Sequence, residues 1–298
     1  MQKVQKWLVF GSTSVAAACL LLSCSGGTSS DKKEEMKDTT AVVAAPPPAD
    51  DPEVSYVLPS PVQVADIFKK AGLRYYSGIS NNTGNVSTYK AGSVITKALN
   101  LGIYSADLSY CVLNKQSQES KNYFKVCKEL AADLGLAKAF EVKDVAQRME
   151  KNISNQDSLA SILVDIQMET DDLLSEDKQE YISVVSFAGA WIESMYIGVQ
   201  VHAKEKNMAI SNELVQQMTI AENIIKALKV HADRDAAIGD LVQKMNTLND
   251  IYNGFKSIQE IKATDPEVID ASKLTISITE LYSFSKRLDE IRNSIIKG

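Results

Sequence analysis

Proline, histidine and long apolar runs are scarce in this chain of 298 residues. It has seven prolines, and none of them lies between Val62 and Asp265. Because proline breaks helices, a proline-free stretch of that length favours long helices. No second long apolar run follows the one near the N-terminus, which excludes a membrane protein with several spans.

The composition is that of an ordinary globular protein. Hydrophobic residues make up 45% of the chain and charged residues 23%, which excludes a collagen-like, fully disordered or purely coiled-coil chain. The formal net charge is -6. Because binding to phosphates needs a net basic face, we expect no nucleic-acid partner.

Motifs of metal, cofactor and catalytic sites are also missing. The sequence contains no HExxH, no CxxC, no Asp-rich calcium loop, no GxSxG elbow and no glycine-rich phosphate or dinucleotide loop. The only two histidines, His202 and His231, would lie roughly 25 Å apart in a hairpin of helices 176–205 and 212–230. They could not share a metal ion, and we expect no metal site, no cofactor and no recognisable catalytic set.

The first 23 residues have the features of a removable export signal. Lys3 and Lys6 precede an apolar stretch from Trp7 to Leu22, which is short for a spanning helix. The stretch ends in Leu-Leu-Ser-Cys24, which resembles the bacterial lipobox. The resemblance implies cleavage before Cys24, diacylglycerol on its sulfur and an acyl chain such as palmitate on the new amino terminus. A plain secretory signal with an incidental Cys24 is the alternative.

Residues 24–60 are expected to form a disordered tether. Six of the seven prolines lie in or directly after this segment: Pro46, Pro47, Pro48, Pro52, Pro59 and Pro61. Such a composition cannot bury enough apolar surface to fold, and a flexible chain of this length spans roughly 30–36 Å. The tether would hold the folded part away from a lipid surface. Asp38-Thr39-Thr40 in the tether and Asp157-Ser158-Leu159 further on look like the short motif that Bacteroidota use for O-glycosylation.

The rest of the chain, residues 61–298, is predicted to be an all-α domain. Apolar residues recur at spacings of three and four, and period-two runs are absent. We expect a helical bundle or a short stack of antiparallel helical hairpins. The expected helices lie near residues 61–71, 88–100, 103–114, 118–134, 141–151, 156–173, 176–205, 212–230, 234–260 and 267–296.

The helix near 176–205 differs from the others because it is apolar almost all round. Such a helix is contacted from several sides and belongs at the centre of a domain. Ser186, Gly189, Glu193 and Gln200 interrupt the apolar surface near one face. The small residues among them would let another helix approach closely.

Once Cys19 is removed and Cys24 lipidated, Cys111 and Cys127 remain as candidates for a disulfide. In a hairpin centred near Gln116, the two cysteines would be offset by roughly 9 Å along the helix axes. That offset exceeds the usual reach of a disulfide. We therefore predict two free, buried thiols.

Two acidic residues lie in apolar helical segments. Asp107 would lie at the same height as Lys125 in the same hairpin. It is predicted either to form a charge pair there or to anchor a ligand between Tyr104 and Tyr110. Glu193 stands in the middle of an apolar run and needs a partner if it is buried. It is predicted to be either a carboxylate paired with Lys, Arg or a hydroxyl group, or a general acid with a raised pKa.

Three segments resemble uncharacterised outer-membrane lipoproteins of Bacteroidota. They are Gly102-Ile-Tyr-Ser-Ala-Asp-Leu-Ser-Tyr110, Lys128-Glu-Leu-Ala-Ala-Asp-Leu-Gly135 with Tyr123 before it, and Gly189-Ala-Trp-Ile-Glu-Ser-Met-Tyr196. Together with the lipobox, the resemblance covers most of the chain. It implies an all-helical fold and an envelope location, and it carries no assigned activity.

Two functions remain open from the sequence. The first is a non-enzymatic lipoprotein, anchored to the outer membrane by lipid on its periplasmic or surface face, whose helical domain binds an envelope protein or serves as a scaffold. The second is a small-molecule-binding protein or an enzyme. Its pocket would be built from residues of the two apolar helices: Tyr104, Asp107, Tyr110, Trp191, Glu193 and Tyr196.

Overall fold

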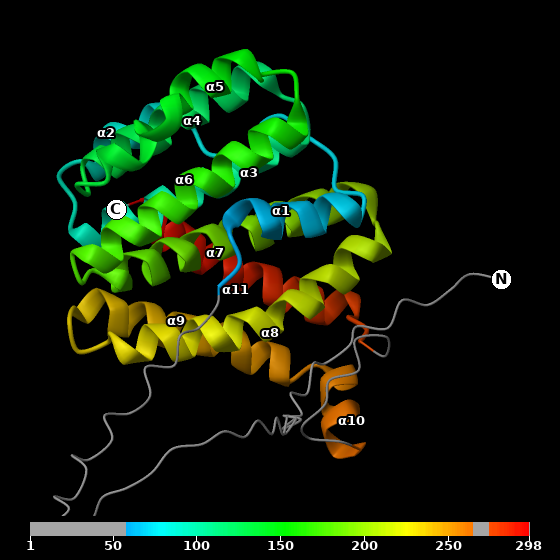
Figure 1. The fold of residues 1–298 in the computed structure, drawn as a ribbon. Coiled ribbons are helices and arrows are strands. Elements are labelled where there is room, and N and C mark those ends of the chain that lie inside the picture. Colours follow the sequence, from blue (N-terminus) through cyan, green and yellow to red (C-terminus); the bar gives the residue numbers. More distant parts are fainter. Residues whose placement is uncertain (1–57, 265–273, 298) are drawn as a thin grey trace, which may run out of the picture. The chain divides into compact units, whose positions relative to one another are not determined.

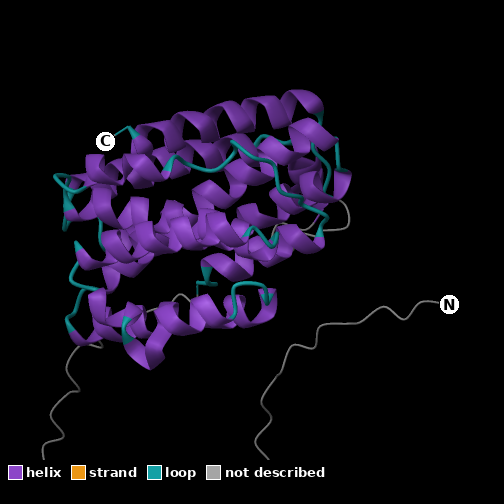
Figure 2. Cartoon of the chain, turned by 90° about the horizontal axis from the view of Figure 1, so that it is seen from above, coloured by secondary structure: helices purple, strands orange, loops and turns teal. Residues whose placement is uncertain are grey.

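The structure, a computed structural model, describes residues 58–264 and 274–297, which belong to one compact unit. Within these ranges every regular element is helical, which confirms the predicted all-α class (Figures 1 and 2). The α-helices are α1 Pro61–Lys70, α2 Val86–Tyr89, α3 Val94–Leu113, α4 Ser117–Ala132, α5 Val145–Lys151, α6 Gln156–Glu176, α7 Glu180–Glu205, α8 Met208–Val230, α9 Ala236–Asn253, α10 Lys256–Thr264 and α11 Ile278–Ile296. Three 3₁₀ turns, η1 Thr83–Asn85, η2 Ala137–Phe140 and η3 Val142–Asp144, lie in the connections.

The predicted signal segment, Cys24, nearly all of the tether and the Asp38-Thr39-Thr40 motif lie outside the described residues. Of the predicted tether, residues 58–60 are described, and Leu58 is partly buried against the core. These three residues therefore adjoin the domain, and the tether itself stays a prediction. The Asp157-Ser158-Leu159 motif lies in the first turn of α6, where Ser158 N–H donates to Asn155 Oδ1 at 3.0 Å.

The first described helix begins where the sequence predicts it. Ser60 is the N-cap of α1: its hydroxyl accepts from Gln63 N–H, while the Gln63 side chain accepts from Ser60 N–H at 2.7 Å. Pro61 occupies the first helical position, where its missing N–H costs nothing.

Several helix boundaries differ from the predictions, and three of the differences are large. The helix expected over 267–296 begins only at Ile278, because Ser277 and Glu280 form a capping box there and residues 274–277 are not helical. Its expected start at Pro266 lies outside the described residues. The expected helix 234–260 is divided at Gly254 into α9 and α10.

The third difference concerns α3, which was expected as two helices, 88–100 and 103–114. The helix is continuous across Gly102, since this glycine faces a neighbouring helix rather than ending its own. A Cβ atom on Gly102 would lie 1.8 Å from Ser186 O of α7, and one on Gly189 would lie 2.2 Å from Leu99 O of α3. The two backbones therefore touch through reciprocal glycines. The predicted close approach at Ser186 and Gly189 is confirmed.

Helices α3 and α7 form the centre of the domain, and the predicted central position of the helix near 176–205 is confirmed. Each of the two buries 16 residues. Helix α4 packs on α3, while α8 packs on α7 and then carries α9 on its other side. Helix α11 contacts both α7 and α9, and α1 lies across α3 and α7. In Figure 1, α4 and α5 accordingly lie on one side of the central pair and α8 and α9 on the other, while α6 overlies α3.

Among the described residues, α7 alone is long and apolar enough to cross a bilayer by length and composition. However, 78% of its apolar window is buried inside the domain. Trp191 and Ile192 at its middle are completely buried. This burial identifies α7 as a core helix.

Cys111 and Cys127 are both free and buried, as predicted. They lie on α3 and α4, whose antiparallel packing places Cys127 beside Ser105 instead, with 3.8 Å between Sγ and Oγ. Burial raises the pKa of Cys127 to about 12. Both thiols therefore act as small apolar residues.

Candidate functional site

A buried polar network lies between α3, α7, α11 and the loop that joins α1 to η1. Its centre is Asn81, which is 8% exposed. Asn81 N–H and Nδ2 both donate to Asp107 Oδ2, at 3.1 and 2.8 Å. Asn81 Oδ1 accepts from Arg292 Nη2 at 2.8 Å. One loop residue thus connects an acidic group of α3 with a basic group of α11.

Arg292 and Glu193 form the strongest part of this network. The guanidinium donates through Nε to Glu193 Oε2 at 2.5 Å and through Nη2 to Oε1 at 3.0 Å. Their side chains are 7% and 0% exposed. The Tyr196 ring lies against the guanidinium, with 3.8 Å from its centroid to Cζ. This two-pronged geometry is the one in which a buried ion pair offsets the cost of its desolvation.

Asp107 has a different environment from Glu193. Burial raises its pKa well above the ordinary value of 3.8, and the negative charge of Glu193 raises it further, while Asn81 and Arg292 act in the opposite direction. Its second oxygen, Oδ1, is buried and has no hydrogen-bond partner among the described residues. A single arginine balances a single carboxylate, so the network favours a neutral, protonated Asp107 beside an ionised Glu193.

Tyrosine hydroxyls attach the same loop to the helices. Tyr104 donates to Asn82 O at 2.8 Å, and Tyr123 donates to Asn81 O at 2.7 Å. Tyr110 donates to Arg74 O at 2.9 Å and accepts from Tyr76 N–H at 2.7 Å. Burial raises the pKa of all three tyrosines, so they remain protonated donors. The network and these hydroxyls hold an irregular segment against the helical core.

The structure brings together most of the residues that the sequence singled out. Asp107 and Glu193 both bond to the Asn81–Arg292 unit, while Tyr104, Tyr110 and Tyr196 contact the loop or the arginine. Trp191 is fully buried in the core. The Glu193 hypothesis of pairing with Lys or Arg is confirmed by its contact with Arg292.

One expected partner is wrong. Asp107 does not pair with Lys125, which is exposed on α4. The Oδ2 atom of Asp107 instead accepts two hydrogen bonds from Asn81, because the loop before η1 passes between α3 and α11. Sequence reasoning missed Asn81 altogether, since nothing in a loop sequence marks an inward-facing amide.

Sequence reasoning also missed Arg292, although its position in the helix indicates that it is buried. It follows Ile291 and stands four residues after Leu288, so it lies on the buried side of α11. A basic residue at such a position needs a buried acid, and Glu193 was the acid without an assigned partner.

None of the six residues proposed for a ligand pocket lines the cavity between α3 and α6. Tyr110 lines a second, smaller cavity that has room for about one water. His202 Nδ1 is 2.8 Å from Asn207 O, whereas His231 lies against the Tyr181 ring. Within the described ranges, no three His, Cys, Asp or Glu side chains are grouped to hold a metal ion.

Comparisons with protein-family models, with curated proteins and with solved structures find no match to this chain.

Replacing Asp107 with Asn tests the protonation state of this group. The folded state holds the Asp107 proton more tightly than the unfolded state. The stability it supplies is therefore complete below pH 4 and is lost as the pH rises towards the raised pKa. We expect Asp107→Asn to unfold no more easily than the wild type at pH 7 and to show a smaller fall in stability between pH 4 and pH 8, measured by urea unfolding.

The matched control is Asp107→Ala, which leaves both Asn81 donors unpaired. It should cost about 1–3 kcal/mol for each unsatisfied group. An Asp107→Asn variant that is as unstable as Asp107→Ala at pH 7 would show that Asp107 is ionised in the folded protein.

Proposed function

We propose that this chain is a lipid-anchored protein of the bacterial cell envelope, whose helical domain acts as a non-enzymatic binding or scaffold module. Lipid on Cys24 would attach it to the outer membrane, and the segment before Leu58 would space the domain from the lipid surface. The resemblance to outer-membrane lipoproteins of Bacteroidota is part of this proposal. The partner would be a component of the envelope.

One structural observation carries the non-enzymatic part of the proposal. The residues that could have supplied a catalytic acid are engaged in holding the fold together. Both oxygens of Glu193 accept from Arg292, and Asp107 accepts twice from Asn81. A carboxylate enclosed in this way is not within reach of a substrate.

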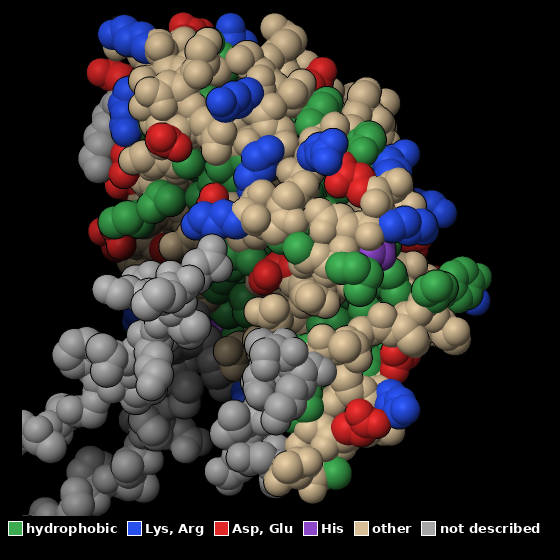
Figure 3. Space-filling view, turned by 90° about the vertical axis from the view of Figure 1, so that its right-hand side faces the viewer, with side chains coloured by type: hydrophobic (Ala, Val, Ile, Leu, Met, Phe, Trp, Pro, Cys, Tyr) green, Lys and Arg blue, Asp and Glu red, His purple; other side chains and the backbone are tan. Residues whose placement is uncertain are grey.

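The surface also fits a module that binds a protein or serves as a scaffold. On the face shown in Figure 3, basic and acidic side chains are interspersed rather than gathered into a field of one sign. Such a surface supports solubility close to a membrane without drawing the domain onto nucleic acid. Most of the exposed apolar groups, such as Met168 and Val230, stand singly, and Ile278 and Tyr282 lie one turn apart on α11.

The lipid anchor is tested by replacing Cys24 with Ala in a bacterial host that processes lipoproteins. We expect the wild-type protein to sediment with membranes and its N-terminal peptide to begin at an acylated Cys24. The Cys24→Ala variant should carry no acyl group and should keep the apolar stretch from Trp7 to Leu22, because the expected cleavage depends on Cys24. In the wild type, several acyl chains supply the anchoring free energy at about 0.8 kcal/mol per buried methylene.

Cys19→Ala is the matched control, because Cys19 lies in the segment that is removed. It should behave as the wild type does. An unmodified Cys24 in the wild-type protein, or acylation of the Cys24→Ala variant equal to that of the wild type, would contradict the proposal.

A further inference from the structure

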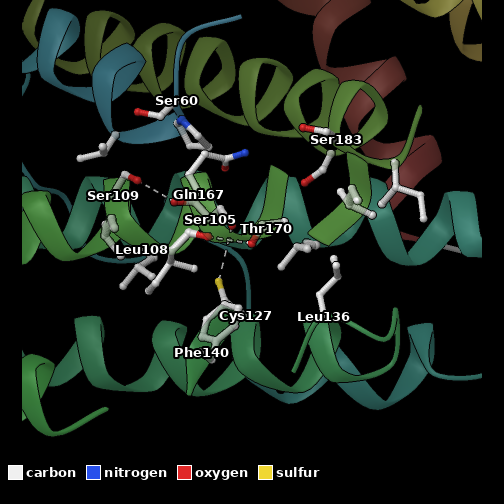
Figure 4. Close-up of a pocket in the computed structure, with 18 residues that line it drawn as sticks. Ser60, Ser105, Leu108, Ser109, Cys127, Leu136, Phe140, Gln167, Thr170 and Ser183 are labelled. Carbon is white, nitrogen blue, oxygen red and sulfur yellow. Dashed lines mark hydrogen bonds between the residues drawn. The ribbon is translucent and has the colours of Figure 1, made fainter. Parts of the chain in front are cut away.

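A cavity lies between the start of α1, α3, α6 and α7, with Cys127 of α4 and the η2 turn at its floor (Figure 4). The space free of atoms is about 640 Å³, and this value includes open solvent at the mouth. The enclosed part holds only a few waters, so a larger ligand needs α6 to move outward. The buried polar network described above is not part of this cavity.

The lining of this cavity changes from apolar at the floor to polar at the mouth. Buried apolar side chains form the floor: Leu101, Leu108, Cys127, Leu136 and Phe140. Half-buried hydroxyl and amide groups surround the mouth: Ser60, Gln167, Thr170, Ser183 and Ser186. None of the 18 lining residues carries a charge. A charged group inside the cavity would therefore find no counter-ion.

Three of the hydroxyl groups that line the cavity, those of Ser109, Thr170 and Ser183, have committed their hydrogens. Ser109 Oγ donates to Ser105 O at 2.8 Å, and Thr170 Oγ1 donates to Ile166 O at 2.8 Å. Each of these oxygens keeps lone pairs that can accept. Because of this, the cavity favours a ligand that brings its own hydroxyl donors.

One negative charge stands beside the mouth. Asp171, which is exposed on α6, accepts from Gln167 Nε2 at 3.0 Å and from the Ser183 hydroxyl. Gln167 and Ser183 both line the cavity. A carboxylate or phosphate head group at the mouth would be repelled by Asp171, whereas a neutral head group would not.

Helix α6 covers the cavity and is only lightly anchored. Of its 21 residues, four are buried: Leu159, Ile162, Ile166 and Leu174. Its lining residues run from Leu163 to Leu174, which corresponds to roughly 16 Å along the helix axis. A long, thin ligand can follow this helix, and a small outward shift of α6 widens the space without opening the α3–α7 contact.

From these features we propose that the cavity binds a neutral single-chain lipid of the monoacylglycerol type. The acyl chain lies on the apolar floor along α6 and α3, and the glycerol hydroxyls donate to oxygens at the mouth. This site is separate from the lipid anchor at Cys24, and it would exist whether or not Cys24 is acylated.

The test uses equilibrium dialysis of the full chain carrying Cys24→Ala, so that the protein's own lipid cannot fill the cavity. The probes are radiolabelled 1-monomyristoylglycerol and myristate, each below its critical micelle concentration. We expect saturable binding of one monomyristoylglycerol per chain, at least tenfold tighter than that of myristate, a difference of about 1.4 kcal/mol. Equal binding of the two probes, or no saturable binding of monomyristoylglycerol, would overturn the proposal.

Three substitutions locate the site. Thr170→Trp fills the mouth and should weaken monomyristoylglycerol binding at least tenfold. The control Thr219→Trp, on the exposed face of α8 with a similar hydroxyl-to-backbone bond, should leave it unchanged. Asp171→Asn removes the charge at the mouth and should bring the affinity for myristate closer to that for monomyristoylglycerol. Equal effects of the two tryptophans, or an unchanged preference in Asp171→Asn, would contradict the assignment.

A photoactivatable monoacylglycerol provides a readout that needs no substitution in the domain. With the light-sensitive group at the end of the acyl chain, cross-links should map to peptides of α3, η2 or α6. Cross-links confined to the exposed end of α11 around Tyr282 would overturn the proposal in favour of adsorption at the surface.

Discussion

Arg292→Met should lower the free energy of unfolding by about 3–5 kcal/mol, because it leaves Glu193 buried without its counter-charge. Glu193 is completely buried, and both of its oxygens accept from the arginine. The substitution also removes the donor to Asn81 Oδ1 and the cation that lies against the Tyr196 ring. The value is measured by urea unfolding at pH 7, followed by circular dichroism.

Two control variants separate the lost ion pair from lost packing. Arg287→Met changes the same residue type on the same helix, where the pair with Glu290 is half exposed, and should cost about 1 kcal/mol or less. The double variant Glu193→Gln with Arg292→Met removes both charges and should be more stable than Arg292→Met alone. If Arg292→Met lost no more stability than Arg287→Met, the pair would not hold the fold.

Gly102→Ala should destabilise the domain by about 3 kcal/mol or more, since it places a methyl group against a backbone that cannot move aside. The new Cβ atom would lie 1.8 Å from Ser186 O and 2.8 Å from Ala190 N, both of them backbone atoms of α7. Gly189→Ala produces the reciprocal clash with Leu99 O. Each variant forces the two central helices apart, and thermal unfolding should show the loss as a clearly lower Tm.

The matched control for the glycines is Gly239→Ala in α9. A Cβ atom there meets nothing within 4 Å, so this variant gains helix propensity without a clash. It should be more stable than the wild type by about 0.5–1 kcal/mol. A Gly102→Ala variant as stable as Gly239→Ala would show that α3 and α7 are not in backbone contact.

The sequence predicted those features that depend on neighbouring residues. The start of α1 follows from Ser60, Pro61 and Gln63, which cap and begin a helix within one turn. The free thiols follow from counting residues around a short hairpin turn, where the axial rise fixes the levels of Cys111 and Cys127. The central place of α7 follows from its all-round apolar surface.

The predicted helix boundaries were wrong where a tertiary contact outweighed the local helix propensity. Gly102 is read from sequence as a helix end, because glycine is a poor helix former. In the structure it lies in the middle of α3, since a side chain there would collide with α7. Gly102 lacks a side chain because the two helices pack closely there. The residue pattern within α3 gives no information about this contact.

What the sequence alone determined is therefore the helical class, the central helix and the presence of two acids that needed partners. Only the tertiary structure decided which residues are the partners of these acids. Arg292 is 99 residues from Glu193 along the chain, and Asn81 is 26 residues from Asp107. Pairing at such distances depends on how helices and a loop pack together. An acidic residue in an apolar helix indicates from sequence alone that a compensating group is needed. Only the fold brings that group to it.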